Sequence, residues 1–138
     1  MSLSNLGEIS PLKTWKIPLR TNNFLTWSDL FFSIRSFLEK IKKLPGETKI
    51  YCGHEYTLQN SKFCITYDKD NQNLIKKIKD IKEKSKKKIP TIPSTINDEL
   101  KSNIFLRSDN KEIKTNLGIN NSTSLTTFSK LRDLKDNF

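Results

Sequence analysis

The sequence has little of several residue types on which common functional sites depend. Its 138 residues include one histidine, two cysteines and four glycines. The cysteines, Cys52 and Cys64, are twelve positions apart, which matches neither a zinc-binding nor a redox-active spacing. We therefore predict that both are reduced thiols in a cytoplasmic protein, because disulfides seldom persist in that compartment.

Long hydrophobic runs are lacking as well. No apolar stretch approaches the roughly 18–20 residues that a membrane-spanning helix needs, so we predict no membrane association. The first twenty residues contain no apolar core and no cleavage-like site, and we expect no signal peptide. The length predicts one domain, or one compact domain with an extension. A hydrophobic content of 34%, with eight phenylalanines, is enough for a modest core.

Positive charge is abundant, and nearly all of the excess is lysine. The formal net charge is +10, and much of it lies in "KKIKDIKEKSKKK" at residues 76–88, where Asp80 and Glu83 interrupt the run. Such runs on helices usually face solvent, and no known nucleic-acid motif surrounds this one. We predict a solvated helix face and do not favour nucleic acid as a partner. The alternative left open is a small basic binding module for nucleic acid or another anionic partner.

Hydrophobic spacing predicts a mainly α chain. Apolar residues recur at helical intervals from Leu30 to Leu44, and Pro45-Gly46 ends this pattern. Thr95 and Asp98 resemble a capping box before a short helix. The predicted helices cover residues 28–43, 56–66, the lysine-rich run, the segment after Thr95, and 123–136. We expect a turn at 68–73, a proline-bounded extended connection at 88–95, and irregular structure at 104–124.

One short strand is predicted at residues 48–52, where "TKIYC" combines β-branched and aromatic side chains, and "TWKIPL" at residues 14–19 is a candidate for a second. A lone strand leaves backbone donors and acceptors unpaired on both edges. The remaining sequence offers few candidate partners for it. We therefore expect this strand to be unpaired within the chain and to provide a docking edge for another chain.

Three quoted segments, together with the helix before the strand, carry a family resemblance. "LPGETKIYCGHEYT", "IPTIPSTINDELKSNIFLR" and "FSKLRDLKDNF" follow one another in this order. They resemble glyoxalase II, the hydroxyacylglutathione hydrolase of the metallo-β-lactamase superfamily, from about residue 28 to residue 138. One departure is Ile104, where proline is usual in the family.

The resemblance implies a two-part fold. In the family, an αββα sandwich holds two zinc or iron ions, and a helical C-terminal domain helps to hold glutathione. Mapped onto this sequence, residues 1–25 are an irregular N-terminal segment. Residues 26–53 are a remnant of the sandwich, namely one helix and its last strand. Residues 54–138 are the helical, glutathione-binding domain.

The resemblance also implies a reaction and a set of binding residues. The reaction is hydrolysis of a glutathione thioester, S-lactoylglutathione, to glutathione and lactate in methylglyoxal detoxification. His54 corresponds to a metal ligand, and Tyr56, Arg132 and Lys135 correspond to glutathione contacts. Cations and a phenol suit the two carboxylates of glutathione, and residues three apart share one helix face. The ordinary alternative for this pair is a solvated helix end, where cations are favoured anyway.

The metal-binding motif of the family, His-x-His-x-Asp-His, does not occur in these 138 residues. A zinc site needs three or four ligands, and His54 supplies one. We therefore expect no tightly bound metal and assign no catalytic residue. The chain is expected to be a truncated or split hydrolase, inactive alone. A separate chain carrying the metal-binding half is the alternative that would restore activity.

Overall fold

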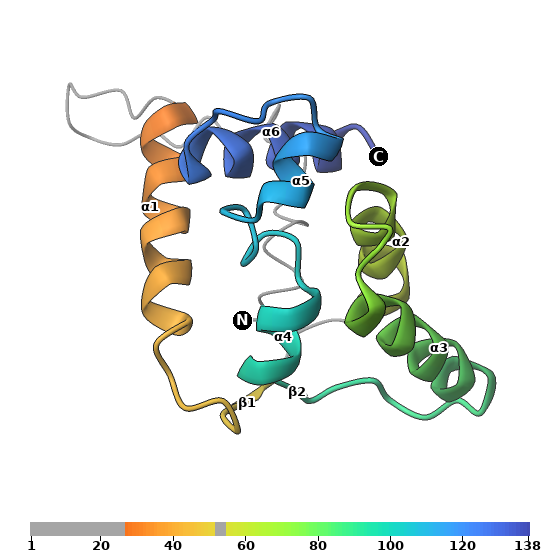
Figure 1. Cartoon of the computed structure of the whole chain (residues 1–138). Coiled ribbons are helices and arrows are strands. Elements are labelled where there is room, and N and C mark those ends of the chain that lie inside the picture. The colour runs from red at the N-terminus through yellow and green to blue at the C-terminus, as the bar shows by residue number, and fades with distance from the viewer. Residues whose placement is uncertain (1–26, 52–54) are drawn as a thin grey trace.

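The computed structural model describes residues 27–51 and 55–138. These residues form six helices and two very short strands, so the prediction of a mainly α fold is confirmed (Figure 1). Among the described helices, none combines the length and apolar character that crossing a bilayer requires. The elements are α1 (Trp27–Ile41), β1 (Lys49–Ile50), α2 (Thr57–Tyr67), α3 (Gln72–Lys86), β2 (Ser94–Thr95), α4 (Ile96–Ser102), α5 (Lys111–Asn116) and α6 (Ser124–Asp136).

Side-chain caps fix where several of these helices begin. The predicted cap at Thr95 is confirmed, because its hydroxyl accepts a hydrogen bond from the Asp98 backbone N–H at 3.2 Å. Thr123 caps α6 in the same way, accepting from the Thr126 N–H at 3.1 Å. Each cap satisfies a backbone donor that the first helical turn leaves without an intrahelical acceptor. Local sequence therefore decides these boundaries.

The short helix α5 corrects the prediction of irregular structure at 104–124. The Asn110 side chain accepts hydrogen bonds from the N–H groups of Glu112 and Ile113, at 2.8 and 3.2 Å. Gly118 follows the helix with a φ of +70°, a left-handed conformation in which glycine ends a helix without steric cost. The prediction missed α5 because its six residues bury only Ile113, and one apolar position establishes no period.

The pairing of β1 corrects the prediction of an unpaired strand. β1 runs antiparallel to β2, with Lys49 opposite Thr95 and Ile50 opposite Ser94. The pairing continues beyond the strands, where the Asn97 N–H donates to the Gly46 carbonyl at 3.0 Å. The partner was missed because two residues of a proline-bounded connection show no strand-like alternation. One edge of β1 is thus already occupied within the chain.

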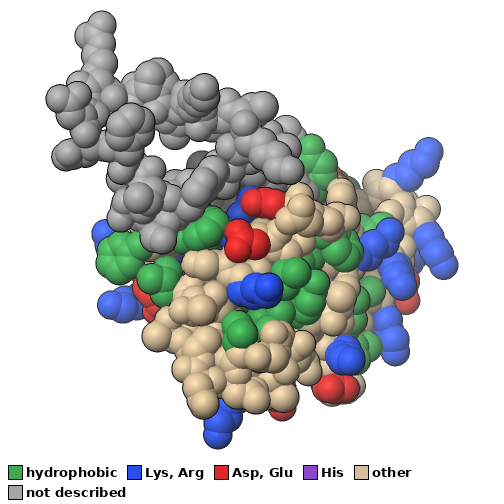
Figure 2. Space-filling view, turned by 90° about the horizontal axis from the view of Figure 1, so that it is seen from above, with side chains coloured by type: hydrophobic (Ala, Val, Ile, Leu, Met, Phe, Trp, Pro, Cys, Tyr) green, Lys and Arg blue, Asp and Glu red, His purple; other side chains and the backbone are tan. Residues whose placement is uncertain are grey.

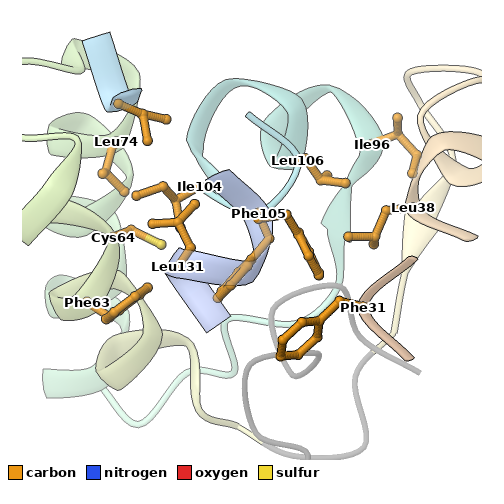
Figure 3. Close-up of a cluster of buried hydrophobic side chains, with 12 residues drawn as sticks. Phe31, Leu38, Phe63, Cys64, Leu74, Ile96, Ile104, Phe105, Leu106 and Leu131 are labelled. Carbon is orange, nitrogen blue, oxygen red and sulfur yellow. The ribbon is translucent and has the colours of Figure 1, made fainter. Parts of the chain in front are cut away.

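In Figure 1, α1 lies on one side of the molecule and α2 and α3 on the other, with α4 and α5 between them and α6 running across the top. Four phenylalanine rings form a continuous series of contacts through the core. Phe31 meets Phe128 at 6.4 Å between centroids, Phe128 meets Phe105 at 5.7 Å, and Phe105 stacks on Phe63 at 5.9 Å. Figure 3 shows the rings of Phe31, Phe63 and Phe105 among the aliphatic side chains of the same cluster, including the fully buried Ile104. The core therefore connects α1 to α2 through α6.

Candidate functional site

Lys135, in the last turn of α6, is held by two aromatic rings. Its Nζ atom lies 5.7 Å from the ring centroid of Phe63 and 5.7 Å from that of Phe138. The two rings meet edge to face, with 5.3 Å between centroids and 77° between planes. Within the part of the chain that the structure describes, Lys135 forms no ion pair. Its ammonium is therefore placed against two aromatic rings.

Arg132, one turn earlier in α6, has different surroundings. The side chain is 1% exposed, and its guanidinium pairs with the Asp136 carboxylate. Burial lowers the pKa of the Arg132 guanidinium, and the charge of Asp136 opposes that effect. Burial likewise raises the pKa of the Asp136 carboxyl, with Arg132 opposing. Part of the hydrogen-bonding capacity of Arg132 is thus committed inside the protein.

Tyr56 occupies the position immediately before α2 and is 41% exposed. The next residue, Thr57, lines a cavity of about 30 Å³ together with Phe63 and Lys135. The beginning of α2 and the end of α6 therefore border the same hollow. Of the three predicted glutathione contacts, Lys135 is the one that lines it. The cavity has room for about one water molecule.

His54, the predicted metal ligand, and Cys52 lie outside the described residues. The residues that follow them are tied to the segment before β2. The Glu55 carboxylate accepts hydrogen bonds from the backbone N–H of Thr91, at 3.1 Å, and from its hydroxyl. The hydroxyl of Thr91 also bonds that of Thr57 at 2.7 Å. Sequence reasoning missed these contacts because each joins residues more than thirty positions apart.

A buried carboxylate, Glu99 in α4, joins three elements and was also missed. It is 4% exposed and accepts hydrogen bonds from Lys77 of α3 at 2.8 Å, Ser94 of β2 at 2.7 Å and Asn103 at 2.8 Å. Burial alone would raise the pKa of the Glu99 carboxyl, but the Lys77 ammonium and the hydrogen bonds together outweigh burial and lower the pKa. Glu99 is therefore held ionised inside the protein.

A groove of about 450 Å³ runs beside this network, between α3 and the segment that contains β2 and α4. Its charges are mixed. Within it, Lys77 pairs with Glu99, and Lys84 pairs with Asp80 at 2.8 Å. The outward-facing lysines of α3 are exposed, as the sequence predicts for a solvated helix face. They are Lys76, Lys79, Lys82 and Lys86.

The described residues do not fit a metal centre. They contain no group of three or more His, Cys, Asp or Glu side chains arranged to hold an ion. Cys64 is a free thiol, as predicted, but it is buried. Burial is the main cause that raises its pKa to about 11, so the thiol is neutral near pH 7 and is a poor metal ligand.

Two kinds of comparison identify the class of protein to which this helical arrangement belongs. Residues 55–138 match the family described as hydroxyacylglutathione hydrolase C-terminus. The chain belongs to this family, which bears out the resemblance drawn from the sequence.

Individual relatives agree with the family assignment. A hydroxyacylglutathione hydrolase of Pelagibacter ubique is 58% identical over 113 residues, which make up 82% of this chain and 40% of that protein. Those of Bartonella henselae and Crocosphaera subtropica are each 41% identical, over 101 and 99 residues. The aligned residues make up 73% of this chain and 40% of the Bartonella henselae protein, and 72% of this chain and 38% of the Crocosphaera subtropica protein. The chain thus spans about 40% of the length of these curated relatives.

Proposed function

We propose that this chain supplies the substrate-binding, C-terminal part of a hydroxyacylglutathione hydrolase. In this proposal Lys135, with Arg132 and Tyr56, binds the glutathione portion of S-lactoylglutathione. The observation that carries the proposal is the family match over residues 55–138, at whose end Lys135 presents an ammonium without a carboxylate partner among the described residues. Figure 2 shows the side of the molecule seen from above, where cationic side chains lie next to exposed hydrophobic ones.

The proposed roles of the three residues follow from their surroundings. Glutathione carries two carboxylates, and an ammonium held in position can donate charge-assisted hydrogen bonds to one of them. Arg132 is buried and paired with Asp136, so its proposed contribution is its positive charge close to the bound ligand. Tyr56 is partly exposed at the start of α2 and offers a phenol hydroxyl.

We propose that the hydrolytic step depends on residues beyond these 138. The sequence has one histidine, and the described residues contain no metal-binding group. We propose that the metal-bearing residues of the working enzyme, with zinc as the expected metal, lie outside this sequence, either in a longer polypeptide or in a separate chain. We propose that the complete enzyme acts in the cytoplasm, in methylglyoxal detoxification.

The test of binding uses the purified 138-residue chain and glutathione, followed by nuclear magnetic resonance. We expect glutathione to shift amide resonances at the start of α2 and the end of α6. Lys135→Gln should weaken binding by about tenfold to a hundredfold, since a hydrogen bond to a charged group contributes roughly 1.5–3 kcal/mol. Lys130→Gln, an exposed α6 lysine, is the matched control and should leave the affinity unchanged. Equal affinities for wild type and Lys135→Gln would remove the proposed role of Lys135.

The test of catalysis uses S-lactoylglutathione as the substrate, with added zinc and elemental analysis of the protein. We expect less than one tightly bound zinc per chain and no thioester hydrolysis. Stoichiometric zinc together with measurable turnover would show that the 138 residues form a complete site, contrary to the proposal.

A further inference from the structure

We propose that Phe138 is a positioning residue for substrate binding, because with Phe63 it forms an aromatic seat that fixes the Lys135 ammonium. The seat consists of the Phe63 and Phe138 rings. The inference rests on the proposed role of Lys135 in binding glutathione and extends it to two uncharged residues that position its ammonium.

The geometry of the seat distinguishes it from an accidental surface contact. Both ring centroids lie 5.7 Å from Nζ of Lys135, within the roughly 6 Å over which a ring face attracts a cation. The rings also support each other edge to face at 5.3 Å. The ammonium thus has two aromatic partners, which come from different elements, α2 and the residues after α6.

The two rings are anchored to different degrees. Phe63 is 0% exposed, stacks on Phe105 with 12° between planes, and contacts Tyr67 at 5.3 Å. Phe138 is 57% exposed and follows α6 by two residues. The backbone N–H of Phe138 donates to the Lys135 carbonyl at 3.3 Å, which directs the chain back over the end of the helix. Replacing Phe138 therefore tests the seat without opening the core.

Aromatic rings can order a lysine ammonium without occupying its hydrogen-bond donors, whereas a carboxylate in an ion pair occupies them. A lysine side chain loses rotamer freedom when it binds a ligand, and prior ordering reduces that entropic cost. The rings attract the charge but accept none of its conventional hydrogen bonds, so the N–H donors stay available for a carboxylate. Arg132, in contrast, donates to Asp136. The seat is therefore suited to order Lys135 while leaving it competent to bind.

The experiment compares Phe138→Leu with Phe138→Tyr, using the affinity for glutathione and the chemical shift of the Lys135 Hε protons. The control is Phe37→Leu, which removes a ring of 48% exposure on α1. We expect Phe138→Leu to weaken glutathione binding about twofold to fivefold, which is the range for a cation–π contact at a partly exposed site. Phe138→Tyr should restore it, and Phe37→Leu should have no effect.

The Hε shift reports the seat directly. Protons held over ring faces should resonate upfield of those of the exposed Lys130, and Phe138→Leu should move the Lys135 protons toward the Lys130 value. In a Lys135→Gln background, Phe138→Leu should cause no further loss of affinity. A further loss of the same size would mean that Phe138 acts on binding by another route and would overturn the inference.

The remaining outcomes separate the two proposals. If wild type binds glutathione and Phe138→Leu binds it equally well with an unchanged Hε shift, the proposed role of Phe138 is wrong and the proposed glutathione-binding function is retained. If wild type does not bind glutathione, the proposed function fails, and the Hε shift alone decides whether the rings position Lys135. If Phe138→Leu unfolds, the test uses wild type and Phe138→Tyr. An upfield shift of the Lys135 Hε protons in both proteins supports the seat, and the lack of an upfield shift in wild type refutes it.

Discussion

The outward-facing lysines of α3 and two of the cations of α6, Arg132 and Lys135, carry the same charge in different surroundings. Lys79 and Lys82 are exposed on a helix face that points to solvent. Arg132 is buried against Asp136, and Lys135 rests on two aromatic rings. The larger number of cations is on α3, but most of those cations face solvent.

Lys77, an α3 lysine that is fixed by another element, shows what makes the difference. Lys77 lies on the inner side of the helix and donates to Glu99 of α4 and, at 3.0 Å, to Ser102. Lys135 is likewise fixed by a residue of another element, Phe63 of α2. An exposed ammonium ordered only by solvent keeps its rotamer freedom and is screened by salt. Tertiary contacts, and not charge density, therefore decide which lysines of this chain are held in position.

The largest predicted effect comes from removing the carboxylate that fixes Lys77. Glu99→Ala should lower the free energy of unfolding by about 3 kcal/mol, because it leaves Lys77, Ser94 and Asn103 without their shared acceptor in a buried place. Urea denaturation measures this change. Glu83→Ala, at an exposed position of α3, is the control and should change stability by less than about 0.5 kcal/mol.

The same carboxylate predicts how stability depends on pH. The folded-state pKa of Glu99 is below its ordinary value of 4.5, so the unfolded chain binds more protons between the two values. The stabilisation contributed by Glu99 should therefore be present above about pH 4.5 and be lost as the pH falls toward the folded-state pKa. Glu99→Gln should reduce this acid loss of stability, measured by urea unfolding across the acid range.

Asp136 gives the opposite sign and serves as a matched comparison. Burial raises its pKa above the ordinary value of 3.8, so the folded state binds more protons in the window just above that value. Asp136 thus opposes the Glu99 dependence there, and Asp136→Asn should make the acid loss steeper. Identical acid profiles for Glu99→Gln and wild type would show that Glu99 is not preferentially ionised in the folded state.

The helices could be predicted from sequence where hydrophobic residues repeat over several turns. The predictions of 28–43 and 123–136 lie within two residues of α1 and α6 at each end. α5 was missed because its burial depends on Ile113 alone. The pairing of β1 with β2 was missed because it joins two dipeptides that are distant in the chain, and such pairing is decided by tertiary contacts.

The candidate site was only partly predictable for the same reason. Lys135 was found through the family resemblance, but its seat depends on Phe63, which is 72 positions away along the chain. Glu99 reads as an ordinary polar residue of a short helix, because glutamate is seldom fully buried unless it is paired. Its pairing depends on where α3 and β2 pack, which no local pattern encodes.

The smallest predicted effect is also the most direct test of the difference between free and fixed cations. Replacing Lys79, Lys82 and Lys86 together by glutamine lowers the net charge by three, yet it removes no ion pair among the described residues. At physiological salt we expect the glutathione affinity to stay within twofold of wild type and the free energy of unfolding within about 0.5 kcal/mol. Lys77→Gln, a single change on the same helix, should destabilise more than all three together because it leaves the buried Glu99 carboxylate without its cation. If the triple variant instead lost glutathione binding as Lys135→Gln is expected to, the total charge of α3 would contribute to binding. Fixation by tertiary contacts would then not be what separates binding cations from the other cations of the chain.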